Sequence, residues 1–160
     1  MAKRKQRDED RAVRDVMVRD VVTVDGSATV LEAAMRMRDA NIGMLPVTEA
    51  SELRGVVTDR DLVVRAMSRD VRPSEMLVRD CLSEPARCAE ESWSLDDALE
   101  EMALQQVGRL PVVDDGGRVV GVVTLSSLAL RSPKQRETLE TAQEISRRSS
   151  RASGRSTRPA

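Results

Sequence analysis

Apolar residues recur at the spacing of an α-helix in two separate stretches of the chain. In the first stretch, Val30, Ala33, Ala34 and Met37 fall on one helical face. The second stretch repeats this spacing at Leu95, Ala98, Leu99 and Met102. Polar residues predominate on the opposite face in both stretches. The pattern therefore predicts two amphipathic helices.

A start signal precedes each of these helices. Thr29 and Ser94 stand directly before the first apolar residue, and an acidic residue, Glu32 or Asp97, follows three positions later. This is the arrangement of a capping box, in which each side chain accepts a hydrogen bond from the backbone N–H of the other residue. We therefore expect the helices to begin just after Thr29 and Ser94.

Two short apolar runs, separated by a polar turn, follow each helix. The first run contains Leu-Pro-Val and the second ends in Gly-Val-Val-Thr, while the turns read TEASEL and DDGG. A further helix is expected after each second run, at about residues 59–67 and 125–130. With a strand ahead of each first helix, the order strand, helix, strand, strand, helix predicts an α/β (α+β) fold.

The two halves of the chain are copies of one another. Residues 29–47 align with residues 94–112, and GVVTDRDL at 55–62 aligns with GVVTLSSL at 121–128. One copy is too small to bury its own sheet, so we expect the two to pack together. The predicted organisation is a disordered segment at 1–10, repeats at 11–72 and 73–131, an exposed helix at 132–148 and a disordered basic tail at 149–160.

The residue types present disfavour enzymatic chemistry. The chain has no histidine, which removes Ser-His-Asp and Cys-His nucleophile pairs and imidazole metal ligands. Cys81 and Cys88 form neither a CxxC pattern nor part of a second pair, so we expect reduced thiols, with Cys81 in the core. We expect no catalytic residue and no metal site.

Charge and hydropathy suggest where the protein works. The net charge is −1, but residues 149–160 are rich in arginine; a solvated tail is favoured over one that contacts nucleic acid or acidic lipid. No run of about 18 uncharged apolar residues occurs, and MAKRKQRDED lacks the apolar stretch of a secretory signal. We expect a cytoplasmic protein without a membrane or nucleic-acid partner.

The repeated motifs resemble a tandem pair of CBS motifs, the cystathionine β-synthase type of regulatory repeat that pairs into a Bateman module. The resemblance rests on RDVMVRDVVTV, NIGMLPV and GVVTDRDL in the first copy and on VRDCL, VGRLPVV and GVVTLSSL in the second. It covers about residues 13–130 and extends to small stand-alone bacterial CBS-pair proteins of the hypoxic-response type. It implies two β-α-β-β-α motifs packed about a pseudo-twofold axis and a homodimer formed through their helices.

The resemblance also implies a ligand, namely AMP, ADP, ATP or S-adenosylmethionine, and no resident cofactor. In the family, the base lies against strands of one motif, and the ribose and phosphates meet the Thr/Ser-x-x-Asp junction of the other. Carried onto this chain, the main site comprises Thr58, Arg60, Asp61, Arg87, Cys88, Val107, Gly108, Arg109, Leu110 and Pro111. A weaker site comprises Thr23, Gly43, Met44, Leu45, Pro46, Thr124 and Ser127. It is weaker because Ser127 stands where the family has its ribose-binding Asp.

Thr58 and Asp61 admit two interpretations. A threonine at a helix N-terminus attracts phosphate, and a carboxylate three residues later can accept both vicinal hydroxyls of a ribose. The same spacing is also a variant of the capping box, in which Asp61 folds back onto the backbone of Thr58. Within a CBS pair we favour the ligand site.

The sequence thus predicts a non-catalytic regulatory protein. It would sense an adenosine-containing ligand and signal to an unknown protein partner through a change of conformation or dimer packing. The alternative is a ligand-independent interaction or structural module with degenerate nucleotide sites.

Overall fold

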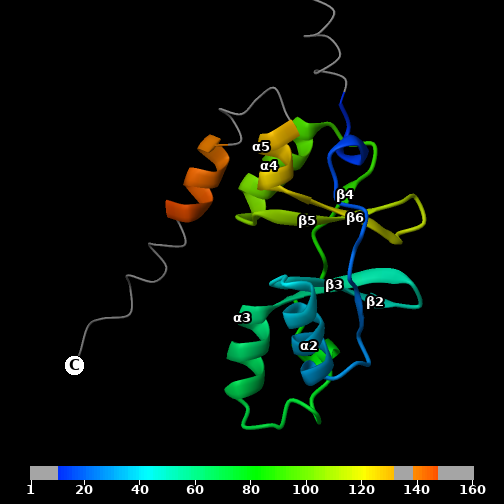
Figure 1. The fold of residues 1–160 in the computed structure, drawn as a ribbon, viewed down its shortest axis with the longest axis vertical. Helices are drawn as coiled ribbons and strands as arrows, with labels where there is room; N and C mark the ends of the chain where they lie inside the picture. The colour runs from blue at the N-terminus through cyan, green and yellow to red at the C-terminus, as the bar shows by residue number, and fades with distance from the viewer. Residues whose placement is uncertain (1–10, 132–138, 148–160) are drawn as a thin grey trace, which may run out of the picture. The chain divides into compact units, whose positions relative to one another are not determined.

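The computed structural model describes residues 11–131 and 139–147 (Figure 1). The predicted disordered segment at residues 1–10 and the basic tail at residues 149–160 lie outside the described residues. Of the predicted helix at residues 132–148, the described part, residues 139–147, is helical. Both repeats lie within the described residues.

The first repeat forms a three-stranded sheet with helices on one side (Figure 1). The repeat begins with a 3-10 turn, η1 (Val13–Asp15). This turn is followed by β1 (Val24–Asp25), α2 (Val30–Ala40), β2 (Met44–Glu49) and β3 (Glu52–Thr58). The last helix begins as α3 (Asp59–Asp61) and continues as a π-helical turn, η2 (Leu62–Ala66). In the sheet, β2 lies between β1, to which it is parallel, and β3, to which it is antiparallel.

The second repeat has the same order of elements. They are η3 (Val78–Asp80), β4 (Ala89–Glu90), α4 (Leu95–Gln105), β5 (Arg109–Val113), β6 (Val119–Thr124) and α5 (Leu125–Arg131). The sheet order is β4-β5-β6. The predicted α/β fold class and the order of elements are confirmed in both copies, whereas the two 3-10 turns and the π-helical turn were not predicted.

Both capping boxes are confirmed. The Thr29 hydroxyl accepts from Glu32 N at 3.1 Å, and Glu32 Oε2 accepts from Thr29 N at 2.7 Å. In the second repeat, the Ser94 hydroxyl accepts from Asp97 N and Asp97 Oδ2 accepts from Ser94 N. Each box satisfies two backbone groups that a helix end leaves without partners, so α2 and α4 begin where the sequence predicts.

The long helices end at residues in the left-handed conformation. Asn41 closes α2 with φ 52°, and Gln106 closes α4 with φ 58°. The backbone N–H of Asn41 bonds back to the carbonyls of Met37 and Arg38. The nearby glycines, Gly43 and Gly108, do not supply this left-handed residue, although glycine is the usual choice.

The two hairpins turn with different chemistry. In the first, Glu49 pairs with Glu52, and the two residues between them, Ala50 and Ser51, have positive φ values of 50° and 72°. In the second, Asp114 Oδ1 accepts from the backbone N–H groups of Gly116 and Arg118, both at 2.9 Å. The second turn thus has the glycines and the aspartate that a tight turn favours, and the first does not.

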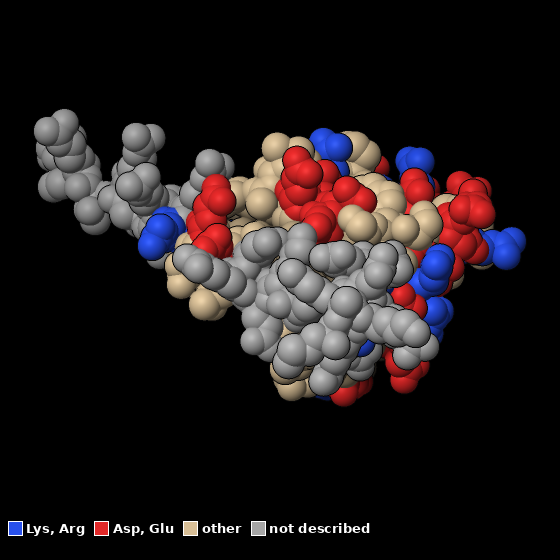
Figure 2. All heavy atoms as spheres, turned by 90° about the horizontal axis from the view of Figure 1, so that it is seen from above, with Lys and Arg blue, Asp and Glu red and all other residues tan. Residues whose placement is uncertain are grey.

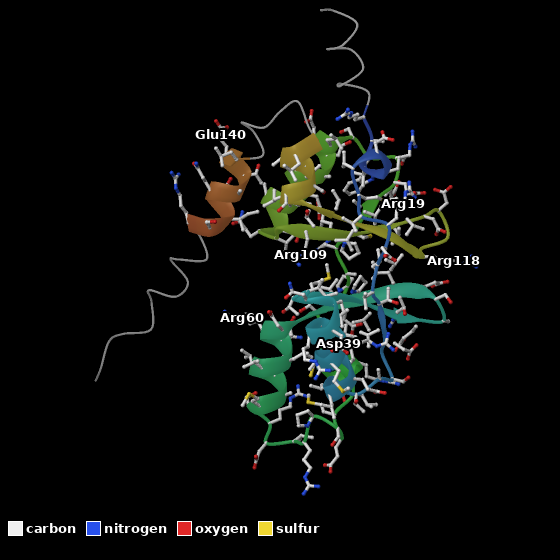
Figure 3. All side chains as sticks on the ribbon, viewed as in Figure 1. Arg19, Asp39, Arg60, Arg109, Arg118 and Glu140 are labelled. Carbon is white, nitrogen blue, oxygen red and sulfur yellow. The ribbon has the colours of Figure 1, made fainter. Side chains whose placement is uncertain are left out.

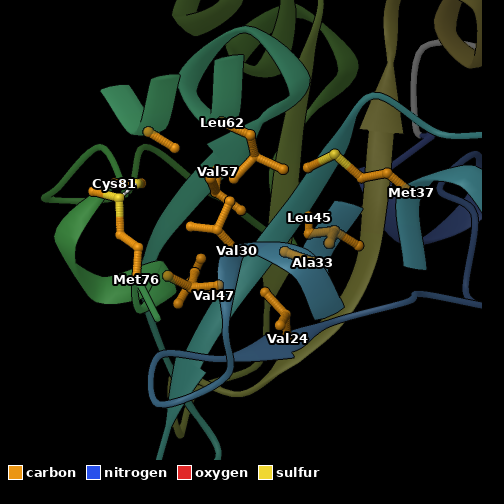
Figure 4. Packing of buried hydrophobic residues seen from close by; sticks show 12 residues of the cluster. Val24, Val30, Ala33, Met37, Leu45, Val47, Val57, Leu62, Met76 and Cys81 are labelled. Carbon is orange, nitrogen blue, oxygen red and sulfur yellow. Dashed lines mark hydrogen bonds between the residues drawn. The ribbon is translucent and has the colours of Figure 1, made fainter. Parts of the chain in front are cut away.

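A hydrophobic core lies between the sheet and helices of the first repeat (Figure 4). Its members come from β1, α2, β2, β3, the last helix and the segment around η3: Val24, Val30, Ala33, Met37, Leu45, Val47, Val57, Leu62, Ala66, Met76, Val78 and Cys81. The prediction that Cys81 is a core residue is confirmed, since its side chain is fully buried.

The chain divides into two compact units that do not coincide with the order of the repeats along the sequence. Of the described residues, one unit contains 20–88 and 113–120, and the other contains 11–19, 89–112, 121–131 and 139–147. The segment that follows each 3-10 turn therefore joins a sheet formed by the other repeat's elements. Val18 bridges Val122 of β6, and Ser83 bridges Val56 of β3.

Glycines allow these two segments to approach the sheets. A Cβ at Gly55 would lie 2.5 Å from Leu82 Cδ1 and 2.7 Å from the Ser83 carbonyl oxygen. A Cβ at Gly121 would overlap the Met17 side chain and lie 3.2 Å from the Val18 carbonyl oxygen. The glycine of each Gly-Val-Val-Thr run thus serves packing against the crossing segment.

Candidate functional site

The candidate site is built around the junction between β3 and the last helix of the first repeat. Asp61 Oδ2 accepts from Thr58 N at 3.0 Å and from Thr58 Oγ1 at 2.7 Å, while Asp61 N donates to Thr58 Oγ1 at 3.2 Å. These bonds form the capping box that was the alternative interpretation of the motif. Capping and ligand binding are compatible, because an ionised carboxylate has about four acceptor positions.

The second oxygen of Asp61 faces an arginine. Arg65, one helical turn further on, brings Nη2 to 3.4 Å from Asp61 Oδ1, and the Asp61 side chain is only 17% exposed. The pair is more shielded from water than the other ion pairs described, such as Arg72–Glu75 and Arg38–Asp39, which lie at the surface. Surface pairs of that kind contribute little to stability.

Asp59 and Arg60 are exposed at the start of α3 (Figure 3). Asp59 N donates to the Gly43 carbonyl at 3.1 Å, which ties the helix start to the beginning of β2. A Cβ at Gly43 would lie 3.0 Å from Asp59 Oδ2. The Arg60 side chain is exposed, so its guanidinium is available to an anionic group.

The corresponding junction in the second repeat is neutral. Thr124 N donates to Ser127 Oγ, Ser127 N donates to Thr124 Oγ1, and Ser127 Oγ donates to the Thr124 carbonyl, with distances of 2.9 to 3.0 Å. Ser127 is 9% exposed and its hydroxyl proton is already engaged. This junction therefore caps a helix but offers no charged acceptor.

Arg109 opens β5 with an exposed side chain (Figure 3). Next to it, the Gly108 carbonyl accepts from Leu125 N at 3.0 Å, the counterpart of the bond between Gly43 and Asp59. A Cβ at Gly108 would find Leu125 Cδ1 at 3.6 Å, an ordinary contact. The strand start in the second repeat thus carries an exposed cation at Arg109, and Leu125 takes the place next to Gly108 that Asp59 has next to Gly43.

The other predicted site residues differ in how accessible they are. Leu45 and Leu110 are fully buried, and Met44, Pro46 and Pro111 are also buried. The accessible or half-buried members are Thr23, Gly43, Arg87, Cys88, Val107, Gly108 and Thr124. The carbonyl of Thr23 accepts from Arg36 Nη1 at 2.8 Å.

Sequence reasoning missed Arg65. Its guanidinium donates to the carbonyls of Cys81 and Leu82 and to Ser83 Oγ as well as pairing with Asp61. The spacing of four residues between Asp61 and Arg65 is a signal for a helical ion pair. Nothing in the sequence, however, indicates that residues 81–83 lie within its reach.

Electrostatics near the junction affect a cysteine. Burial raises the pKa of the Cys81 thiol, while the nearby guanidinium of Arg69 acts in the opposite direction. The thiol is therefore protonated near neutral pH, and its Sγ lies 3.7 Å from Met76 Sδ. Cys81 accordingly serves packing.

The described residues contain neither a cluster suited to a metal ion nor a helix suited to a membrane. Within residues 11–131 and 139–147, no group of three or more Asp, Glu or Cys side chains is arranged to hold a metal ion. No helix in the described part of the chain has the length and apolar character needed to cross a membrane. Acidic and basic side chains lie side by side on the face shown in Figure 2.

The repeats, the sheet order and the Thr-x-x-Asp junction are features of one family. The CBS domain matches the chain twice, at residues 13–68 and 78–133. The chain is therefore a member of the CBS domain family with a tandem pair of these domains. CBS-pair proteins of the stand-alone kind are regulatory modules, not catalytic ones.

Relatives in other organisms support this membership. The chain is 37% identical over 119 residues to the CBS domain-containing protein YhcV of Bacillus subtilis. The aligned residues cover 74% of this chain and 84% of YhcV. It is 35% identical over 130 residues to an uncharacterized protein, MK0525, of Methanopyrus kandleri, covering 81% of this chain and 66% of that protein.

Solved structures share the fold. Hypoxic Response Protein I, crystallised with two coordinated zinc ions, superposes with a TM-score of 0.71 at 30% identity and covers 77% of this chain and all of that one. The CBS pair of MJ0100, in complex with 5-methylthioadenosine and S-adenosyl-L-methionine, gives a TM-score of 0.66 at 25% identity, covering 75% and 94%. CBSX2 in complex with AMP gives 0.65 at 26%, covering 74% and 93%.

Proposed function

We propose that this protein is a cytoplasmic regulatory sensor that binds an adenosine-containing ligand, AMP, ADP, ATP or S-adenosylmethionine, through the Thr58–Asp61 junction. The observation that carries the proposal is the Asp61 carboxylate, which is held in one position by Thr58 and Arg65 and still has acceptor capacity. The acceptor position that remains on Oδ1 can accept a hydrogen bond from a hydroxyl of a ribose. Two structural neighbours were solved with ligands that contain this sugar.

The remaining polar groups have complementary roles in this proposal. Arg60 would contact an anionic part of the ligand, and the Arg109 guanidinium would lie against the purine or pair with a phosphate. The base would meet the backbone of the strand residues assigned to the main site. Asp61 and Arg109 belong to different repeats, so loss of binding in variants of either residue would show that both repeats contribute to one ligand.

A matched pair of variants tests the proposal. Asp61 and Asp97 both close a capping box with a threonine or serine three residues earlier. Asp61→Asn and Asp97→Asn therefore remove the same type of charge from the same type of cap. A thermal-shift titration with AMP, ADP, ATP and S-adenosylmethionine should stabilise the wild type and Asp97→Asn but not Asp61→Asn.

The alternative is a ligand-independent interaction module, which the capping box at Thr58 and Asp61 favours because Asp61 already has partners. Under this alternative, neither Asp variant changes any ligand response, and both lower stability by about 1 kcal/mol. Absence of a shift in the wild type with all four compounds would establish this alternative.

We also propose that the protein forms a homodimer through the helices of the first repeat. The packed helices α2 and α3–η2 leave several large apolar side chains exposed, among them Val63 at 56% and Met67 at 73%. Apolar side chains gathered in this way indicate a contact surface. Light scattering should give a dimer for the wild type and a monomer for Met67→Glu, whereas an unchanged mass would contradict this interface.

A further inference from the structure

Arg65 contacts four acceptors at once. Nη1 donates to the carbonyl of Cys81 at 2.8 Å and to that of Leu82 at 2.7 Å. Nη2 donates to Ser83 Oγ at 3.1 Å and lies 3.4 Å from Asp61 Oδ1. One guanidinium therefore connects the carboxylate of the candidate site to a segment about 20 residues further along the chain.

This segment, residues 81–83, is fixed on its other side by β3. Val56 and Ser83 exchange two backbone hydrogen bonds, at 3.1 and 2.8 Å, and Ala86 N donates to the Arg54 carbonyl at 3.3 Å. Leu82 packs against the core of the first repeat, over Gly55. The same segment continues to Arg87 and Cys88, which the sequence assigns to the main site.

Arginine suits this position for a chemical reason. Its planar guanidinium carries five N–H donors in a fixed fork, so that it can serve several acceptors without changing shape. A lysine at this position carries one ammonium group and cannot serve acceptors on opposite sides of the fork. The Asp61 carboxylate and the two carbonyls together hold the guanidinium in place, because hydrogen bonds that involve a charged group are stronger than neutral ones.

We propose that Arg65 is a positioning residue that couples ligand binding at Asp61 to the order of residues 81–83. The inference rests on the proposed function of Asp61 as a ligand-binding carboxylate. A hydroxyl that bonds to Asp61 Oδ1 shares this oxygen with Nη2 of Arg65, which holds the carboxylate in place. Occupation of the site therefore changes how tightly Arg65 holds the segment that leads into the second repeat.

The second repeat lacks this device. Ser127 replaces the aspartate there, and a neutral hydroxyl already engaged with the Thr124 carbonyl cannot form an ion pair. Coupling of this kind is therefore confined to the junction that carries the charge. This asymmetry fits a protein in which one of two similar junctions transmits a signal.

The first part of the test uses no ligand. Amide hydrogen exchange is measured at Ser83 and Ala86 in the wild type, Asp61→Asn, Arg65→Met and the double variant. Arg72→Met, which removes an arginine from an exposed ion pair with Glu75, is the control. Asp61→Asn and Arg65→Met should each accelerate exchange at these amides about tenfold, and the double variant should exchange no faster than Arg65→Met.

The second part measures the affinity for AMP and S-adenosylmethionine. Arg65→Met should weaken binding of the compound that the wild type binds by about tenfold, Arg65→Lys should restore part of the loss, and Arg72→Met should bind normally. Ligand should also change the exchange of Ser83 in the wild type but not in Arg65→Met. A structural defect alone would leave this ligand response in place.

The outcomes separate the two proposals. If the wild type binds no adenosine-containing compound, the proposed function fails, and the ligand-free exchange data still decide whether Arg65 connects Asp61 to residues 81–83. If ligand binds but Asp61→Asn leaves exchange at Ser83 and Ala86 unchanged, or Arg65→Met retains both affinity and the exchange response, the role of Arg65 is overturned while the function stands.

Discussion

The junctions of the two repeats share a backbone and differ in charge. At Thr58 and Asp61, a carboxylate closes the cap and pairs with Arg65. At Thr124 and Ser127, a hydroxyl closes the same cap without any charge. A neutral cap is sufficient to start the helix in the second repeat, so helix capping alone does not require the charge of Asp61.

The hairpins of the two repeats differ in the opposite sense. The second hairpin has the aspartate and glycines of a favourable turn, whereas the first places Ala50 and Ser51 in the left-handed region. The repeat with the Asp61 carboxylate at its junction is therefore the one with the less favourable turn. The favourable turn and the charged junction thus lie in different copies of one motif.

The largest effect on stability is expected at the glycines that admit the crossing segments. Gly55→Ala places a Cβ against the Ser83 backbone, which cannot move aside easily, and should lower the free energy of unfolding by about 1–3 kcal/mol. Gly108→Ala has room and should change it by less than about 0.5 kcal/mol. Urea unfolding of both variants measures the difference; equal values would mean that residues 81–83 do not pack on β3.

The next effect concerns the turn of the first hairpin. Replacing Ala50 by Asn and Ser51 by Gly gives the pair that a two-residue turn with positive φ prefers. The double variant should raise the free energy of unfolding by about 1–2 kcal/mol, since alanine and serine each cost about 1 kcal/mol in this region, whereas asparagine and glycine adopt it more readily. A melting temperature at or below that of the wild type would contradict the turn geometry.

A smaller difference is expected between the two caps. Thr58→Ala should cost about 1 kcal/mol, and Thr124→Ala about half as much, because only Thr58 bonds to a charged partner. Chemical denaturation of the two variants gives both values under identical conditions. A larger loss for Thr124→Ala would show that the carboxylate adds nothing to the first cap.

The smallest effect concerns the reactivity of the Cys81 thiol. Burial raises the pKa of the Cys81 thiol, so fewer thiolates form at a given pH, and iodoacetamide should modify Cys81 at least about tenfold more slowly in the native protein than in urea. Raising the pH should accelerate the native reaction. Because Arg65 holds the Cys81 carbonyl, Arg65→Met should also accelerate the modification of Cys81. Mass spectrometry at constant pH follows the modification of Cys81 and Cys88 separately. Equal rates for Cys81 in the native and the unfolded protein would contradict its burial.

Features that depend on neighbouring residues could be predicted from the sequence. The capping boxes at Thr29 and Ser94, the two long helices and the hairpins all arise from patterns within a few residues. Each of these patterns occurs in both copies of the repeat. The Thr58–Asp61 motif was recognised in the same way, together with both of its interpretations.

Features that depend on distant residues could not be predicted. The pairing of Ser83 with Val56 joins segments far apart in the sequence, and no local pattern specifies it. The contacts of Arg65 depend on that pairing. Asn41 and Gln106 end their helices in a left-handed conformation that side-chain type predicts only weakly.

Calorimetric titration with AMP and with S-adenosylmethionine tests the central claim most directly, because it counts ligands as well as measuring affinity. Since only one junction carries a carboxylate, the account predicts one ligand per chain for the wild type and for Asp97→Asn, and no binding by Asp61→Asn. Two ligands per chain, or binding that survives in Asp61→Asn, would contradict it.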